Sequence, residues 1–84
     1  MLQNELHLQQ HEYLLSPSLR WFYNQLQMYF TGNHFTSREV GYKVRKSKSL
    51  SYRYLTELVE RELIQIVGKK NASYVYELIE NTGL

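Results

Sequence analysis

Cysteine is absent from this 84-residue chain, which excludes a disulfide framework, a thiolate zinc site and a cysteine nucleophile. Proline occurs once and glycine four times, which argues against a collagen-like or low-complexity chain. No apolar run approaches the ~18 residues that a membrane-spanning helix needs, and no signal-peptide pattern opens the chain. The length allows one domain with a small core. We therefore expect a single cytoplasmic domain without a membrane segment.

Motifs for catalysis and metal binding are also lacking. The spacing of the four glycines permits neither a P-loop nor a G-x-G-x-x-G loop, and no G-x-S-x-G is present. His7 and His11 stand four residues apart, but Leu8 occupies the place where an H-E-x-x-H motif needs glutamate. The simpler interpretation of these histidines is two exposed polar side chains. We expect a protein that is not an enzyme, with no cofactor, no metal and no small-molecule ligand.

Positive charge is concentrated, although the net charge is only +2. Residues 38–53 carry six cations and one glutamate, which gives +5. A second, short basic block is Lys69-Lys70, and an acidic stretch with Glu57, Glu60 and Glu62 separates the two blocks. Such a run is often a solvated face, so its meaning depends on where the fold places it. The cations of the long block are Arg38, Lys43, Arg45, Lys46, Lys48 and Arg53.

The first half of the chain predicts one clear helix. Residues 1–15 show an interrupted apolar stripe and predict an N-terminal arm or a weak helix. Ser16 followed by Pro17 is a typical N-cap and first helical position. Apolar residues then recur with helical spacing as far as Phe30, and Gly32 suits the left-handed position after a helix.

Two more helix starts follow. Thr36 and Glu39 form a T-x-x-E capping box, which predicts a short helix over 37–44. Gly41 lies within that helix, where it is tolerated if another helix crosses closely. Ser47 predicts the N-cap of a third helix that runs to about residue 61.

The last third of the chain predicts a β-hairpin. Residues 63–67 are apolar and β-branched, residues 72–79 form a second strand-like run, and 68–71 are typical of an exposed turn. We therefore expect a mainly α domain with a small β-hairpin over residues 16–80, followed by a short tail at 81–84.

Two segments carry a family resemblance. The run SKSLSYRYLTELVERELI at residues 47–64 resembles the recognition helix of many bacterial regulators, S-x-S-x-x-x-R-x-L-x-x-L-x-x-x-x-L-I. The run FTSREV at 35–40 is similar to the F-T-x-x-[ED]-[LV] opening of the preceding helix. Over residues 17–79 the chain thus resembles the winged helix-turn-helix superfamily, which implies a three-helix core plus a wing.

One departure from the family pattern concerns Leu50 and Ser51, which stand in exchanged order. The family usually has a polar residue followed by an aliphatic one at these positions. Two explanations are open. Either the helix is slightly rotated, or Ser51 lies where two helices cross closely.

The resemblance implies duplex DNA as the partner, in a transcriptional regulator or in the DNA-binding module of a replication or mobile-element protein. A recognition helix fits the major groove, and its N-terminus suits a phosphate. The alternative is a winged-helix protein-interaction module that does not bind DNA. The acidic residues Glu57, Glu60 and Glu62 are expected to point away from DNA. The expected contacts are Ser49, Tyr52, Arg53 and Thr56 in the groove, Ser47 at the helix N-terminus, Arg38, Lys43, Arg45, Lys46 and Lys48 along the backbone, and Lys69, Lys70 and Asn71 at the wing tip.

A further surface is predicted on the first helix. Trp21 and Met28 are seven residues apart, on a side of this helix that the core does not use. Burial of such aromatic surface favours association. We expect this side to meet either a second copy of the chain, in a homodimer, or the N-terminal arm.

Overall fold

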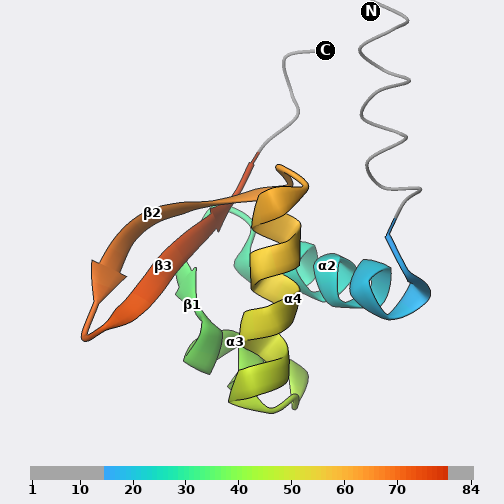
Figure 1. Cartoon of the computed structure of the whole chain (residues 1–84), viewed down its shortest axis with the longest axis horizontal. Coiled ribbons are helices and arrows are strands. Elements are labelled where there is room, and N and C mark those ends of the chain that lie inside the picture. The colour runs from blue at the N-terminus through green and yellow to red at the C-terminus, as the bar shows by residue number, and fades with distance from the viewer. Residues whose placement is uncertain (1–14, 80–84) are drawn as a thin grey trace, which may run out of the picture.

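Three helices and a three-stranded antiparallel sheet make up the part of the chain that the computed structural model describes, residues 15–79 (Figure 1). The arm or helix expected over 1–15, except Leu15, and the tail expected over 81–84 lie outside the described residues. No helix within 15–79 is long and apolar enough to cross a membrane. The elements are α2 (Pro17–Phe30), β1 (Phe35–Thr36), α3 (Ser37–Val44), α4 (Lys48–Glu60), β2 (Ile64–Lys70) and β3 (Ser73–Leu78).

All three predicted helix starts are confirmed by their capping hydrogen bonds. The Oγ of Ser16 accepts from the backbone N–H three residues on at 3.2 Å, and the Oγ of Ser47 does the same at 3.1 Å. In the capping box, the N–H of Glu39 donates to the Oγ1 of Thr36 at 3.3 Å, and the N–H of Thr36 donates to Glu39 Oε1 at 2.9 Å. These bonds satisfy donors that a helix leaves free at its first turn.

The sheet differs from the predicted hairpin in two ways. Phe35 and Thr36, expected only to be part of an extended link and a helix cap, form β1 and pair with β3, so the strand order is β1-β3-β2. The turn predicted over 68–71 is wrong, because β2 continues to Lys70. The actual turn is Asn71-Ala72, with φ angles of 51° and 68°. Two successive positive φ angles are typical of the tight hairpin turn whose twist matches the flanking strands.

The core lies between the helices and one face of the sheet. Four aromatic residues, Phe22, Tyr23, Phe30 and Phe35, are buried. The ring of Phe35 in β1 stacks on Tyr76 of β3 with a centroid distance of 6.0 Å, and it lies 4.9 Å from the ring of Phe30 in α2, which connects the sheet to the helices. The full set of buried apolar residues is Leu15, Leu19, Phe22, Tyr23, Leu26, Phe30, Phe35, Val40, Val44, Leu55, Leu58, Leu63, Ile64 and Tyr76.

The contact between α3 and α4 explains both Gly41 and Ser51. A Cβ atom on Gly41 would lie 2.9 Å from the backbone oxygen of Lys46 and 3.3 Å from Ser51 Oγ. Ser51 is fully buried, whereas Leu50 is only half-buried. The exchanged order of Leu50 and Ser51 is therefore explained by a close approach of α3 and α4, which leaves room for a serine at position 51 but not for a leucine. Within the described residues, the Oγ of Ser51 has no hydrogen-bond partner.

Candidate nucleic-acid interface

The predicted groove-facing residues form one exposed stripe along α4. Ser49, Tyr52, Arg53 and Thr56 are all exposed, and the residues that α4 buries lie on its opposite side. This follows from the 3.6-residue period, which brings positions three, four and seven apart to one face. Figure 1 shows α4 in front of α2 and α3, with the hairpin extending beside it.

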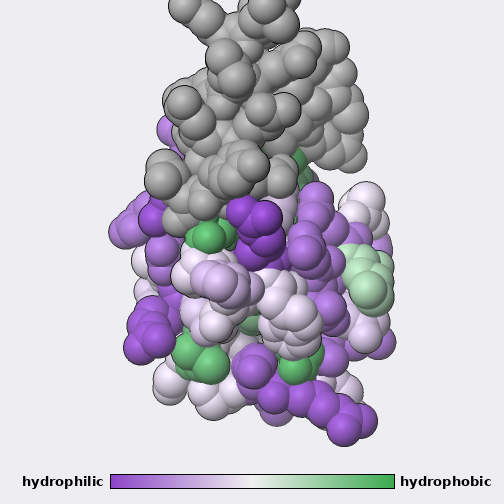
Figure 2. Space-filling view, turned by 90° about the vertical axis from the view of Figure 1, so that its right-hand side faces the viewer, coloured by the Kyte–Doolittle hydropathy of each residue, from purple (hydrophilic) through white to green (hydrophobic). Residues whose placement is uncertain are grey.

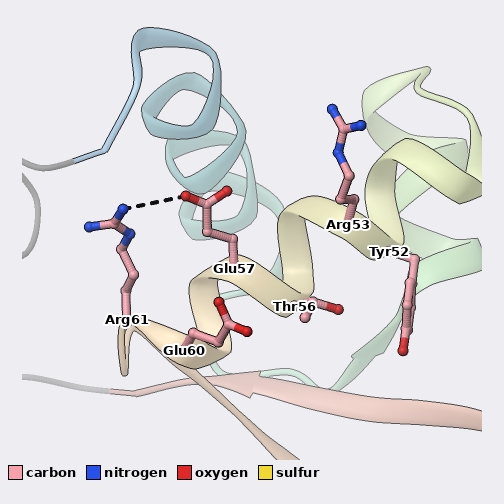
Figure 3. A pocket seen from close by; sticks show the side chains of 6 residues that line it. All are labelled: Tyr52, Arg53, Thr56, Glu57, Glu60 and Arg61. Carbon is pink, nitrogen blue, oxygen red and sulfur yellow. Dashed lines mark hydrogen bonds and ion pairs between the residues drawn. The ribbon is translucent and has the colours of Figure 1, made fainter.

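The same stripe includes two carboxylates. Glu57 and Glu60 were predicted to point away from DNA, and this remains a prediction. Both line one shallow hollow of about 560 Å³ together with Arg53. The reason is helical geometry, because residues 53, 56, 57 and 60 share a face. Figure 3 shows Arg53 and Tyr52 leaving α4 on opposite sides, while Glu57 turns toward Arg61. The hollow is lined by Tyr52, Arg53, Thr56, Glu57, Glu60 and Arg61.

The two carboxylates differ in their partners. Glu57 accepts from the Nη2 of Arg61, one turn further along, at 3.4 Å. Glu60 is exposed and makes no ion pair within residues 15–79. The N-terminal half of the stripe on α4 therefore carries hydroxyl and cationic groups. Its C-terminal half carries two carboxylates, of which Glu57 is paired with Arg61 and Glu60 has no ion-pair partner within residues 15–79.

Four cations of the long basic block, Lys43, Arg45, Lys46 and Lys48, lie between the last turn of α3 and the first residue of α4. Two of its lysines lie against aromatic rings of α2: the Nζ of Lys43 is 5.4 Å from the ring centre of Tyr29, and the Nζ of Lys46 is 5.2 Å from that of Trp21. Such contacts orient a lysine without neutralising its charge. Every cation of this block is exposed: Arg38, Lys43, Arg45, Lys46, Lys48 and Arg53.

The hairpin separates its two lysines. Lys69 is opposite Tyr74, and Lys70 is opposite Ser73. Because neighbouring residues of a strand point to opposite faces, the two lysines lie on different faces of the sheet. An irregularity between Ile66 and Gly68 adds one residue to β2 and sets this register. Lys69 therefore shares the face of Tyr74, and its Nζ is 5.7 Å from the centre of that ring.

A tyrosine cluster joins α4 to the hairpin. The rings of Tyr74 and Tyr76 on β3 have centroids 6.4 Å apart. Burial, followed by the neighbouring Tyr52 and Tyr74, raises the pKa of Tyr76 to about 12. Tyr52 of α4 and Lys69 of β2 are exposed, whereas Tyr76 itself is buried. Asn71, at the turn, is exposed as well.

His34, the one histidine within residues 15–79, contacts β3 and none of the predicted DNA contacts. The Nε2 of His34 lies 3.1 Å from Glu77 Oε1 and so links the segment before β1 to β3. This contact could not be predicted from the sequence, because the two residues are 43 positions apart and no local pattern indicates that they meet. No group of three or more potential metal-ligating side chains occurs within the described part, and His7 and His11 lie outside it.

The second apolar side of α2 is exposed over the described residues. Trp21 is 43% exposed and Met28 is 68% exposed. Figure 2 shows the side of the molecule on which α2 begins, where hydrophobic residues form separate spots among hydrophilic and neutral ones. Trp21 also borders a hollow of about 330 Å³ with Pro17, Lys46 and Tyr54.

The expected association through this side remains a prediction. We expect the double variant Trp21→Ala/Met28→Ala to sediment as a monomer, or to lose a docked arm, because about 150–250 Å² of aromatic surface is removed from the contact. Sedimentation velocity compares the parent with the double variant, and quenching of Trp21 fluorescence is measured in the parent and in a Met28→Ala single variant, which keeps the one tryptophan. A parent chain that is monomeric, with Trp21 fully accessible to the quencher, would contradict both the dimer and the docked arm.

Comparison with known proteins found no match to this chain among protein-family models, curated proteins or solved structures.

Proposed function

We propose that residues 16–80 form a winged helix-turn-helix domain that binds duplex DNA, with α4 in the major groove and the β2–β3 hairpin as the wing. Three features support this assignment: the order of the elements, the close crossing of α3 and α4 at Gly41, and the hairpin that directly follows α4. The exposed stripe of α4 places Arg53, which can pair with guanine in a bidentate manner, in its N-terminal half. That half is where recognition helices contact bases.

The observation that carries the proposal is a set of eight exposed cations that have no carboxylate partner within residues 15–79. The ion pairs recorded within residues 15–79 are His34–Glu77 and Arg61–Glu57, and neither uses a residue of the two basic blocks. A phosphate backbone supplies the missing negative charge in a regular array. The eight cations are Arg38, Lys43, Arg45, Lys46, Lys48, Arg53, Lys69 and Lys70.

A salt titration tests this proposal. If four to six phosphates are neutralised, log K should fall with log salt at a slope of about −4 to −5, so affinity should drop roughly 10²- to 10³-fold between 50 and 200 mM salt. Non-specific binding should be micromolar or weaker at physiological salt. Lys70→Ala should weaken binding to all sequences equally and make the slope shallower by about 1. The measurement is fluorescence anisotropy of a labelled duplex.

Two outcomes would contradict the proposal. Binding that persists with a flat salt response would refute the electrostatic account. Absence of any complex at low salt would favour the second candidate, a winged-helix protein-interaction module. The mixed charges of the hollow on α4, with Arg53, Arg61, Glu57 and Glu60 together, support that second candidate, because protein partners carry both signs of charge.

A further inference from the structure

Glu60 is in an unusual position for a residue on a DNA-binding stripe. It lies on the same face of α4 as Arg53 and Thr56, and it lines the same hollow (Figure 3). Over residues 15–79 it has no cationic partner, whereas Glu57 is paired with Arg61 at 3.4 Å. The charge of Glu60 is therefore available to act on whatever approaches the stripe.

The distances make this charge relevant to a bound duplex. Seven residues separate Arg53 from Glu60, which places Glu60 about 10 Å further along the helix axis at 1.5 Å per residue. The Debye length at 0.1 M salt is also about 10 Å, so the carboxylate acts mainly on phosphates that come closer to it than Arg53 does. A duplex that lay along the whole of α4 would bring phosphates next to Glu60, where like charges repel.

We propose that Glu60 is a specificity-determining residue that restricts duplex DNA to the N-terminal half of α4. This inference rests on the proposed DNA binding. On a preferred site, contacts from the N-terminal half hold the helix with Glu60 away from the backbone. On unrelated sequences no such contacts hold the helix, and orientations that bring Glu60 near phosphate are disfavoured. Glu60 thus lowers non-specific affinity more than specific affinity, which is discrimination by repulsion.

The test compares Glu60→Gln with Glu62→Gln. Both variants remove one negative charge and keep the size of the side chain, and both residues are exposed. Glu62 lies beyond the end of α4, at a φ of 63°, and does not line the hollow, so it controls for net charge alone. The probes are a duplex selected from a random pool by the parent protein and a scrambled duplex of equal length.

We expect Glu60→Gln to bind the scrambled duplex about fivefold more tightly at 50 mM salt and to bind the selected duplex within about twofold of the parent. The gain should disappear at 0.5 M salt because screening shortens the range of the charge. Glu62→Gln should change both affinities by less than about twofold. Both variants should have the same melting temperature as the parent, which would establish that their folds are equivalent.

Failure of this inference is distinguishable from failure of the proposed function. If the parent protein bound neither duplex, both the proposed DNA binding and the proposed role of Glu60 would be refuted. A parent that binds with the expected salt slope, while Glu60→Gln behaves as the parent or as Glu62→Gln, would refute only the role of Glu60. Equal tightening on both duplexes by Glu60→Gln would also refute it, because no discrimination would have been lost.

Discussion

Leu55→Ala should lower the free energy of unfolding by about 2–5 kcal/mol, whereas Arg53→Ala should leave it unchanged. The two residues are two positions apart in α4, and with 3.6 residues per turn this spacing sends their side chains to nearly opposite sides of the helix. Leu55 is fully buried in the cluster that joins α4 to the rest of the core, so truncation leaves a cavity as well as losing apolar burial. Arg53 is exposed on the stripe and makes no ion pair within residues 15–79. Chemical denaturation of both variants measures the difference.

Arg53→Ala should instead act on binding. Its planar guanidinium fork suits the N7 and O6 atoms of guanine, so its loss should cost about 1–3 kcal/mol on a preferred site and relax specificity at one base pair. If Arg53→Ala melted like Leu55→Ala, Arg53 would face inward and the recognition face would have to be rotated. If it folded normally and bound every duplex as well as the parent, the protein-interaction module would become the better assignment.

Gly41→Ala should destabilise the domain by about 1–3 kcal/mol, although alanine is the better helix former. The added Cβ would lie 2.9 Å from the backbone oxygen of Lys46, and a backbone atom cannot move aside as a side chain can. The N–H of Lys46 also donates to the carbonyl of Gly41 at 3.0 Å, so separating the two segments weakens a hydrogen bond of the turn before α4. The cost of overpacking therefore exceeds the helix propensity gained, which is about 1 kcal/mol.

Gly68→Ala is the matched control for this substitution. Gly68 lies in β2, and a Cβ there would meet no heavy atom within 4 Å. Its φ is not in the left-handed region, so alanine should be neutral or stabilise by less than about 1 kcal/mol through the unfolded state. Urea denaturation of both variants provides the comparison. A Gly41→Ala protein as stable as Gly68→Ala would mean that α3 and the turn before α4 do not approach as closely as described.

The helices were predictable because their signals are local. Ser16, Thr36 with Glu39, and Ser47 each mark a helix start within three or four residues, and all three caps are present. The apolar spacing of the first helix likewise identified its buried side, including Phe22 and Phe30. Periodicity likewise placed Ser49, Tyr52, Arg53 and Thr56 on the exposed side of the third helix, and all thirteen residues proposed to contact DNA are exposed. Their role in binding remains a prediction.

Strand pairing, the burial of Ser51 and the register of the hairpin depend on contacts between distant segments, so only the tertiary structure shows them. The sequence by itself determined three helices, a hairpin and a concentration of positive charge, because caps, periodicity and charge are properties of neighbouring residues. It could not determine that Phe35 pairs with Tyr76, or that Ser51 is buried beside Gly41. Nor could it determine the register that sends Lys69 and Lys70 to opposite faces of the hairpin. Strand pairing and close helix crossings are selected by packing across the whole domain, since one residue of slip in register exchanges the two faces of a strand.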